Sequence, residues 1–76
     1  MKIKINNVND AGMINAIANK YKEFDIDCIC GRYIIDLKSI MGILSLGLPK
    51  EVEIEARTDN TSAADSVYRD LERWKV

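Results

Sequence analysis

Hydrophobic and polar residues alternate along three stretches of the chain, and this period of two predicts β-strands with one buried face. The stretches are residues 2–6, residues 25–36 and residues 51–56. The middle stretch is interrupted at Gly31-Arg32, a two-residue connection typical of a hairpin, so it is expected to form two strands. The last stretch sets three glutamates against apolar residues, which predicts one buried and one solvated face.

Helical spacing marks the segments between these strands. Residues 10–23 have their apolar side chains on one helical face. Residues 39–46 form a short apolar helix that Gly47 and Pro49 end. A last helix begins among the N-cap candidates of residues 59–62. The apolar faces of the two longer helices are Met13, Ile14, Ile17, Ala18 and Tyr21 in the first, and Ala64, Val67, Tyr68, Leu71 and Trp74 in the last.

The predicted order of elements is therefore βαββαβα, with a short second helix. Four strands and two amphipathic helices favour a two-layer α+β fold, in which the helices cover one face of a mostly antiparallel sheet. The other face of the sheet is expected to be solvated. The chain has 76 residues, so we expect residues 1–76 to form a single domain with one core.

Composition and charge narrow the classes of protein. The chain is 47% hydrophobic and 30% charged, with a net charge of -1, which is typical of a folded domain and excludes a membrane span. No excess of positive charge is present to hold a phosphate backbone, so nucleic acid is not an expected partner. The N-terminal residues lack the apolar run of a signal peptide, so a cytoplasmic location is expected.

The chemistry for catalysis is missing from the sequence. The chain has no histidine, which excludes the commonest general base and metal ligand. Its glycines are too scattered for a phosphate-binding loop, so we expect no cofactor, no metal and no enzyme. Cys28 and Cys30 are too close in sequence for a disulfide scaffold and are expected to be reduced thiols on one strand face. A redox or metal role for the two thiols is the alternative.

The short apolar helix has more apolar side chains than one sheet can cover. On a helical wheel, Ile43 and Leu46 lie on one side and are expected to face the core. The apolar residues on the other side should partly face water, as a protein contact surface does. These candidate docking residues are Ile40, Met41 and Leu44. The alternative is that a neighbouring loop or the Tyr33 ring covers them.

Ser39 immediately precedes this helix. Its hydroxyl can accept hydrogen bonds from the free N–H groups at the helix start, which is a structural role as an N-cap. The same position also suits a phosphoserine, because the helix end offers donors and a partial positive charge, with Lys38 beside it. The two roles are compatible, and the sequence leaves both open.

Residues 36–47, Asp-Leu-Lys-Ser-Ile-Met-Gly-Ile-Leu-Ser-Leu-Gly, closely resemble the regulatory-serine segment of HPr, the phosphocarrier of the bacterial sugar phosphotransferase system. The resemblance implies an HPr-like open-faced β-sandwich, with a four-stranded antiparallel sheet covered on one face by three helices. It implies that Ser39 is the site of the HPr kinase/phosphorylase. It also implies that Ile40, Met41 and Leu44, with Lys38, contact partners such as phosphotransferase-system enzymes or a catabolite control repressor.

The chain departs from the family at the start of the first helix. There the family has a Gly-Ile-His-Ala-Arg-Pro type of segment whose histidine accepts phosphate, whereas residues 7–12 have neither the histidine nor the arginine. Asp10 in this region would repel an anion. Phosphorelay through histidine is therefore excluded, and the nearest analogy is a family paralogue that also lacks the histidine and serves catabolite regulation.

Two hypotheses follow from these observations. The first is a non-catalytic regulatory module, phosphorylated at Ser39, that docks through its short helix to control carbon metabolism. The second is a structural domain in which the same surface is used for self-association and Ser39 is only a helix cap. A monomer or a weak homodimer fits both hypotheses.

Overall fold

The computed structural model describes residues 1–76, and its elements follow the order predicted from the sequence. The strands are β1 (Lys2–Ile5), β2 (Ile26–Cys30), β3 (Tyr33–Asp36) and β4 (Lys50–Ala56). The helices are α1 (Val8–Ala18), α2 (Ile40–Leu44) and α3 (Thr61–Asp70), and a 3₁₀ turn, η1 (Glu72–Trp74), follows α3.

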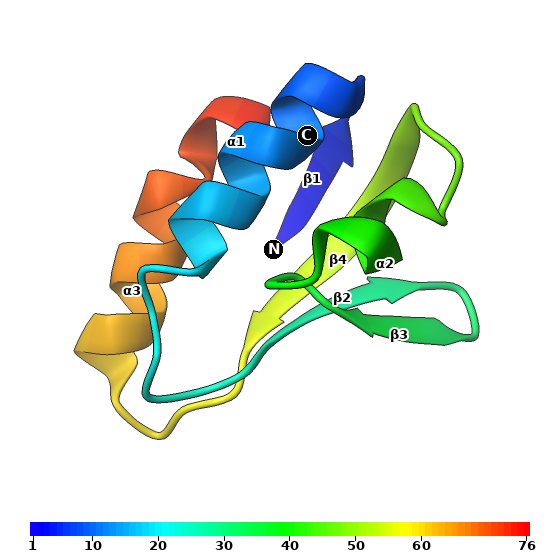
Figure 1. The fold of residues 1–76 in the computed structure, drawn as a ribbon. Coiled ribbons are helices and arrows are strands. Elements are labelled where there is room, and N and C mark those ends of the chain that lie inside the picture. The colour runs from blue at the N-terminus through cyan, green and yellow to red at the C-terminus, as the bar shows by residue number, and fades with distance from the viewer.

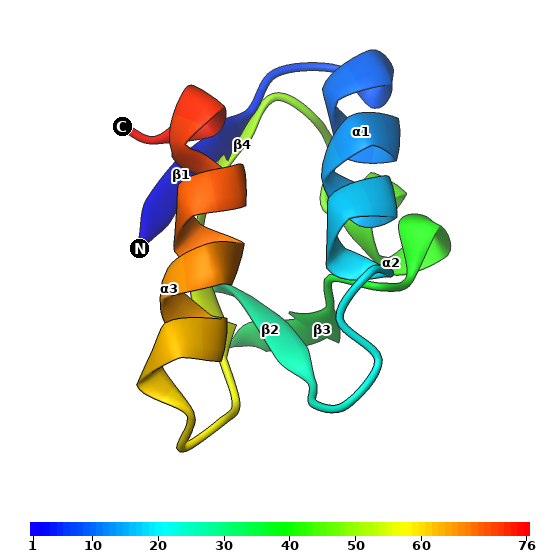
Figure 2. The ribbon, with the colours of Figure 1, turned by 90° about the vertical axis from the view of Figure 1, so that its left-hand side faces the viewer.

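The four strands form one antiparallel sheet in the order β1-β4-β2-β3. All three helices lie on one side of this sheet, with α1 and α3 side by side over it (Figures 1 and 2). This is the predicted open-faced α+β arrangement. On the uncovered face, lysines of β1 lie opposite glutamates of β4, with Lys2 paired to Glu53 and Lys4 to Glu51, an arrangement that favours antiparallel pairing.

The core lies between the sheet and the helices. Its strand residues are those that the alternation predicts, because successive side chains point to opposite faces. The helices contribute the residues of their apolar faces, and α2 contributes one fully buried residue. The buried residues are Ile3, Ile5, Ala11, Ile14, Ala18, Ile26, Cys28, Leu37, Ile43, Val52, Ile54, Val67, Leu71 and Trp74. None of the helices is long and apolar enough to cross a membrane.

The bounds of the first helix differ from the predicted residues 10–23. The helix begins earlier because the Asn7 side chain accepts the Asp10 N–H at 2.8 Å and so caps the first turn. It ends at Ala18. Beyond this point Tyr21 is near α3 instead of continuing the helix, and its hydroxyl donates to the Asp70 carboxylate at 2.6 Å. This bond is the main reason that the pKa of Asp70 lies below its usual value.

The end of the last helix also differs. We expected one helix to carry every apolar residue through Trp74, but the α-helix ends at Asp70 and the chain tightens into the 3₁₀ turn η1. In this turn the Trp74 N–H donates to the Leu71 carbonyl at 3.0 Å. The tighter turn still places the Trp74 ring in the core, so the predicted burial is correct although the predicted helix type is wrong.

Two further features lie at opposite edges of the sheet. Gly31 has φ of 60° and occupies the first central position of the β2–β3 turn, where a tight hairpin needs positive φ. At the opposite edge, the last residues of the chain run beside β1. There the Val76 N–H donates to the Lys2 carbonyl at 3.1 Å, and Ile3 forms a bridge with Lys75. Both termini therefore lie at the β1 edge (Figure 1).

Candidate functional site

The segment before α2 folds through a tight turn that ends at Ser39. The Asp36 carboxylate accepts the Lys38 N–H at 2.8 Å, and the Asp36 carbonyl accepts the Ser39 N–H at 2.9 Å. The Ser39 hydroxyl accepts the Gly42 N–H at 3.2 Å, so Ser39 is the N-cap of α2. The Ser39 side chain is exposed, so its oxygen remains accessible to solvent while it caps the helix.

Two asparagines, Asn15 in α1 and Asn19 at its C-cap, hold this segment against the first helix. The Asn15 amide donates to the Leu37 carbonyl at 3.1 Å, and the Asn19 amide donates to the Lys38 carbonyl at 3.2 Å. Asn15 and Asn19 are four residues apart, so both side chains lie on the same side of the C-terminal end of α1. We call this pair the asparagine clip. Because α2 has five residues and a helix of that length is unstable alone, the clip and the buried Ile43 fix its position.

The three candidate docking residues differ in exposure. Met41 is 76% exposed and Leu44 is 38% exposed, whereas Ile40 is half-buried and packs against the core. The Tyr33 ring, the alternative cover for these residues, is itself 72% exposed. Ile43 is fully buried and Leu46 is half-buried against the core, as the helical wheel predicts. α2 therefore presents two apolar side chains to solvent beside the exposed Ser39.

Lys38 does not point to Ser39. Its ammonium donates to the Phe24 carbonyl at 2.6 Å, in the loop before β2. A half-buried lysine bonded in this way contributes to the anchoring of the α2 segment. The Lys38 ammonium is therefore already hydrogen-bonded within the chain and is not positioned beside the Ser39 hydroxyl.

A hollow of about 330 Å³ lies between the β2–β3 hairpin, the residues that follow the end of α2 and the first residue of β4, and we call it the α2 hollow. It is mostly apolar and has one charged residue. Its lining residues are Cys30, Tyr33, Ile35, Ser45, Leu46 and Lys50.

The two thiols have different surroundings. Cys28 is fully buried, and burial is the main cause that raises its pKa to about 12. Cys30 is half-buried and lines the α2 hollow. With a thiol-specific reagent near pH 8, we expect one thiol of the folded chain to react and both to react in denaturant. The Cys30→Ser variant should then show no reactive thiol while folded, and equal reaction rates of the two native cysteines would contradict this assignment.

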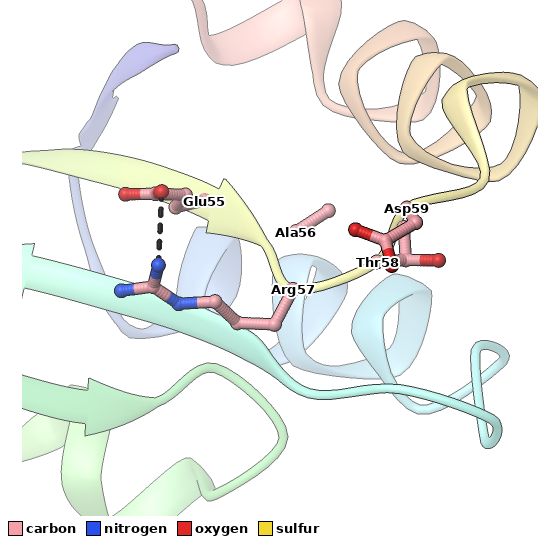
Figure 3. Close-up of a pocket in the computed structure, with 5 residues that line it drawn as sticks. All are labelled: Glu55, Ala56, Arg57, Thr58 and Asp59. Atoms are coloured by element: carbon pink, nitrogen blue, oxygen red, sulfur yellow. Dashed lines mark hydrogen bonds and ion pairs between the residues drawn. The ribbon is translucent and has the colours of Figure 1, made fainter.

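A second hollow, of about 380 Å³, lies where β4 ends (Figure 3). Arg57 is the cation among its lining residues, but it is already paired. The guanidinium donates to Glu55 at 3.0 Å, as Figure 3 shows, and to Asp27 at 2.7 Å. The bond to Asp27 is the main cause that raises the pKa of Arg57. This hollow therefore offers no free positive charge to an anion.

The start of α1 carries negative charge. The Asp10 carboxylate accepts the Asn6 amide at 2.9 Å and the Asn6 backbone N–H at 3.3 Å. The hydrogen bond from the Asn6 side chain is the main cause that lowers the pKa of Asp10. A carboxylate already occupies the positive end of the helix dipole, so the site is unfavourable for an additional anion.

Comparison with known protein families places these features in context. The model of the family described as the PTS HPr component phosphorylation site matches residues 4–72 of this chain. The chain belongs to the HPr family. An HPr crystal structure from Thermoanaerobacter tengcongensis, described as HPr-C-His, is 25% identical, with a TM-score of 0.76 over 96% of this chain and 85% of that one.

A second solved HPr structure has the same fold. It is the histidine-containing phosphocarrier protein of Mycoplasma, which is 20% identical, with a TM-score of 0.75 over 96% of this chain and 86% of that one. No curated protein matches the chain. The family and the fold that residues 36–47 suggested are thus confirmed. Since the chain has no histidine, none of its residues can form a phosphohistidine.

Sequence reasoning did not identify every residue that builds this site. The asparagine clip was missed because Asn15 and Asn19 lie beside the apolar face of α1, where uncharged polar residues usually only contact solvent. Their spacing of four was the available signal. The commitment of Lys38 to Phe24 was also missed, since no local pattern joins a lysine to a carbonyl fourteen residues away.

Proposed function

We propose that this chain is a non-catalytic regulatory protein of the HPr family, located in the cytoplasm, phosphorylated at Ser39, and docking to a protein partner through Ile40, Met41 and Leu44. By family resemblance, the partner is the HPr kinase/phosphorylase, a catabolite regulator or a phosphotransferase-system enzyme. The observation that carries the proposal is an exposed serine at the start of a helix that presents Met41 to solvent. Such a protein would control carbon metabolism without carrying phosphate on histidine.

Phosphate on Ser39 is compatible with the helix. The serine oxygen already accepts the Gly42 N–H, and phosphate oxygens at an N-cap can accept the same donors with greater charge. Within the chain, however, the neighbouring Lys38 ammonium is bonded to Phe24, and the Asp36 carboxylate three residues before is negative. The negative charge of a phosphate on Ser39 would therefore have no free lysine or arginine next to it in the sequence. We infer that the partner supplies the opposite charge, most effectively as arginine.

The proposal is tested with a cognate HPr kinase and ATP. We expect the intact mass of the wild-type chain to rise by one phosphate and the Ser39→Ala mass to stay unchanged. Ser62→Ala is the matched control, because it removes an exposed serine hydroxyl of α3, outside the segment around α2, and should leave phosphorylation intact. A wild-type chain that gains no mass, or a Ser39→Ala chain that gains as much, would refute the switch.

Docking is tested separately. Met41→Asp places a charge at the most exposed apolar position of α2 and should abolish partner binding without unfolding the chain. A member of each of the three partner classes named above is titrated against the wild-type chain by calorimetry. The partner that binds is then used to test Met41→Asp. Arg32→Ala, on the hairpin turn, serves as the surface control and should bind as the wild type does.

The alternative function is a self-associating structural domain in which Ser39 is only a cap. The hydrogen bond that the Ser39 hydroxyl accepts from the Gly42 N–H supports this alternative, because a helix cap needs no phosphorylation. Sedimentation across a wide range of concentrations separates the two functions. Self-association is supported if the molar mass of the wild-type chain doubles at high concentration while that of Met41→Asp stays at the monomer value.

A further inference from the structure

One lysine lies where the strand alternation calls for an apolar residue. Lys50 has the same parity as Val52 and Ile54 in β4, so it belongs to the face of the sheet that the helices cover. The other strand positions on that face are uncharged. Lys50 is half-buried, takes part in none of the ion pairs or side-chain hydrogen bonds of the chain, and lines the α2 hollow. It is therefore a positive charge on an otherwise apolar face, without an internal partner.

None of the other residues that line the hollow is charged. Residues 39–49 contain no charged side chain, although 30% of the whole chain is charged. Met41 and Ser45 are one helical turn apart, and Ser45 lines the hollow, so the exposed face of α2 continues into it. The exposed Tyr33 ring borders the hollow on the side of the hairpin.

The serine hydroxyl that lines the hollow already donates a hydrogen bond within the chain. The Ser45 hydroxyl donates to the Gly42 carbonyl at 2.6 Å, and the Ser39 hydroxyl accepts the Gly42 N–H. The Ser45 hydroxyl, which lines the hollow, keeps its donated bond when the hollow is covered, so its desolvation costs little. Covering Lys50 would be costly unless a carboxylate pairs with it. The charge pattern therefore selects an apolar occupant that carries one negative charge.

We propose that the α2 hollow binds a peptide segment of a partner protein in which an aliphatic or aromatic side chain stands next to a carboxylate. The apolar side chain enters between Leu46 and Ile35, and the carboxylate pairs with the Lys50 ammonium. A volume of about 330 Å³ is at the lower end of ligand clefts, which span roughly 300–1,000 Å³, so it suits one or two side chains. This inference rests on the proposed docking role of α2 and specifies the chemistry of the partner.

The experiment uses random twelve-residue peptides displayed on phage and selected on the intact chain. Enriched peptides are expected to have Asp or Glu within two residues of a large apolar residue. A synthetic copy of an enriched peptide is then titrated by fluorescence polarisation. Lys50→Glu should weaken its binding by about tenfold or more, whereas Lys50→Arg should retain it. Lys22→Glu, which makes the same change at an exposed lysine between α1 and β2, is the matched control and should bind normally.

A second readout reports the position of the peptide. Cys30 lines the hollow and Cys28 is buried, so the bound peptide should slow alkylation of Cys30 in the folded chain. Peptides without a carboxylate preference, equal affinity for Lys50→Glu, or unchanged alkylation of Cys30 would each overturn the inference. If no peptide is enriched, the inference also fails.

The outcomes separate this inference from the proposed function. Binding that is lost in Met41→Asp but kept in Lys50→Glu would retain docking through α2 and reject the hollow. Phosphorylation of Ser39 does not enter the peptide assay, so a negative kinase result leaves the peptide result valid. A concentration-dependent dimer that competes with the peptide would identify a second copy of the chain as an occupant, which contradicts the proposed partner.

Discussion

Replacing Ile43 by alanine is expected to lower the free energy of unfolding by about 3 kcal/mol. Ile43 is the one fully buried residue of α2, and its truncation removes apolar burial and leaves a cavity between α2 and the sheet. A domain of this size is typically stable by about 5 kcal/mol, so the variant should keep only about 2 kcal/mol and unfold at a much lower urea concentration. Urea denaturation followed by circular dichroism measures the loss.

Two variants test whether the loss comes from the buried face of α2. Ile43→Val removes one methylene group at the same site and should cost about 1 kcal/mol. Met41→Ala truncates a large side chain of the same helix that is exposed and should change stability by less than about 0.5 kcal/mol. Equal losses in Ile43→Ala and Met41→Ala would contradict the division of α2 into a buried and an exposed side.

Asn15→Ala is expected to lower the free energy of unfolding by about 1 kcal/mol and to loosen α2 selectively. The substitution removes half of the asparagine clip and leaves the Leu37 carbonyl without its donor. Because α2 is too short to be stable alone, amide hydrogen exchange should accelerate at Gly42 and Ile43. The N–H groups of these two residues bond to Ser39.

Asn9→Ala is the matched control for the clip. Asn9 is an asparagine of the same helix, but its amide contacts only the Met13 sulfur at 3.9 Å. Since alanine is the better helix former, this variant should be unchanged or slightly more stable, with normal exchange in α2. If both variants lose the same stability, the loss reflects a general property of α1 and the clip has no special role.

The sheet could be predicted from the sequence because its signal is local. In β4, glutamates alternate with Val52 and Ile54, and one face of the strand is solvated while the other is buried, as the pattern requires. Independently of this pattern, the resemblance of residues 36–47 to HPr predicted the same fold. The buried position of Ile43 and the exposure of Met41 also followed from the wheel, because one helical face has to meet the sheet.

The remaining features depend on contacts between distant residues. α1 ends at Ala18, and the Tyr21 side chain, which the pattern places on the helical face, bonds to Asp70 of α3 instead. Residues 10–23 alone do not indicate this partner. Lys50 stands one residue before the predicted strand, so its place on the covered face became visible only when β4 was found to begin there. The docking residues and the phosphorylation of Ser39 stay predictions until a partner and a kinase are tried.

The pairing of the C-terminal residues with β1 has a practical consequence for such trials. Val76 and Lys2 are hydrogen-bonded neighbours, and β1 and β3 form opposite edges of the sheet. A tether or fluorophore attached at either end is therefore held on the far side from the hairpin and α2. An immobilised chain would present α2 outward whichever terminus is attached, and a dye pair placed on the two ends would report the separation of the C-terminal residues from β1.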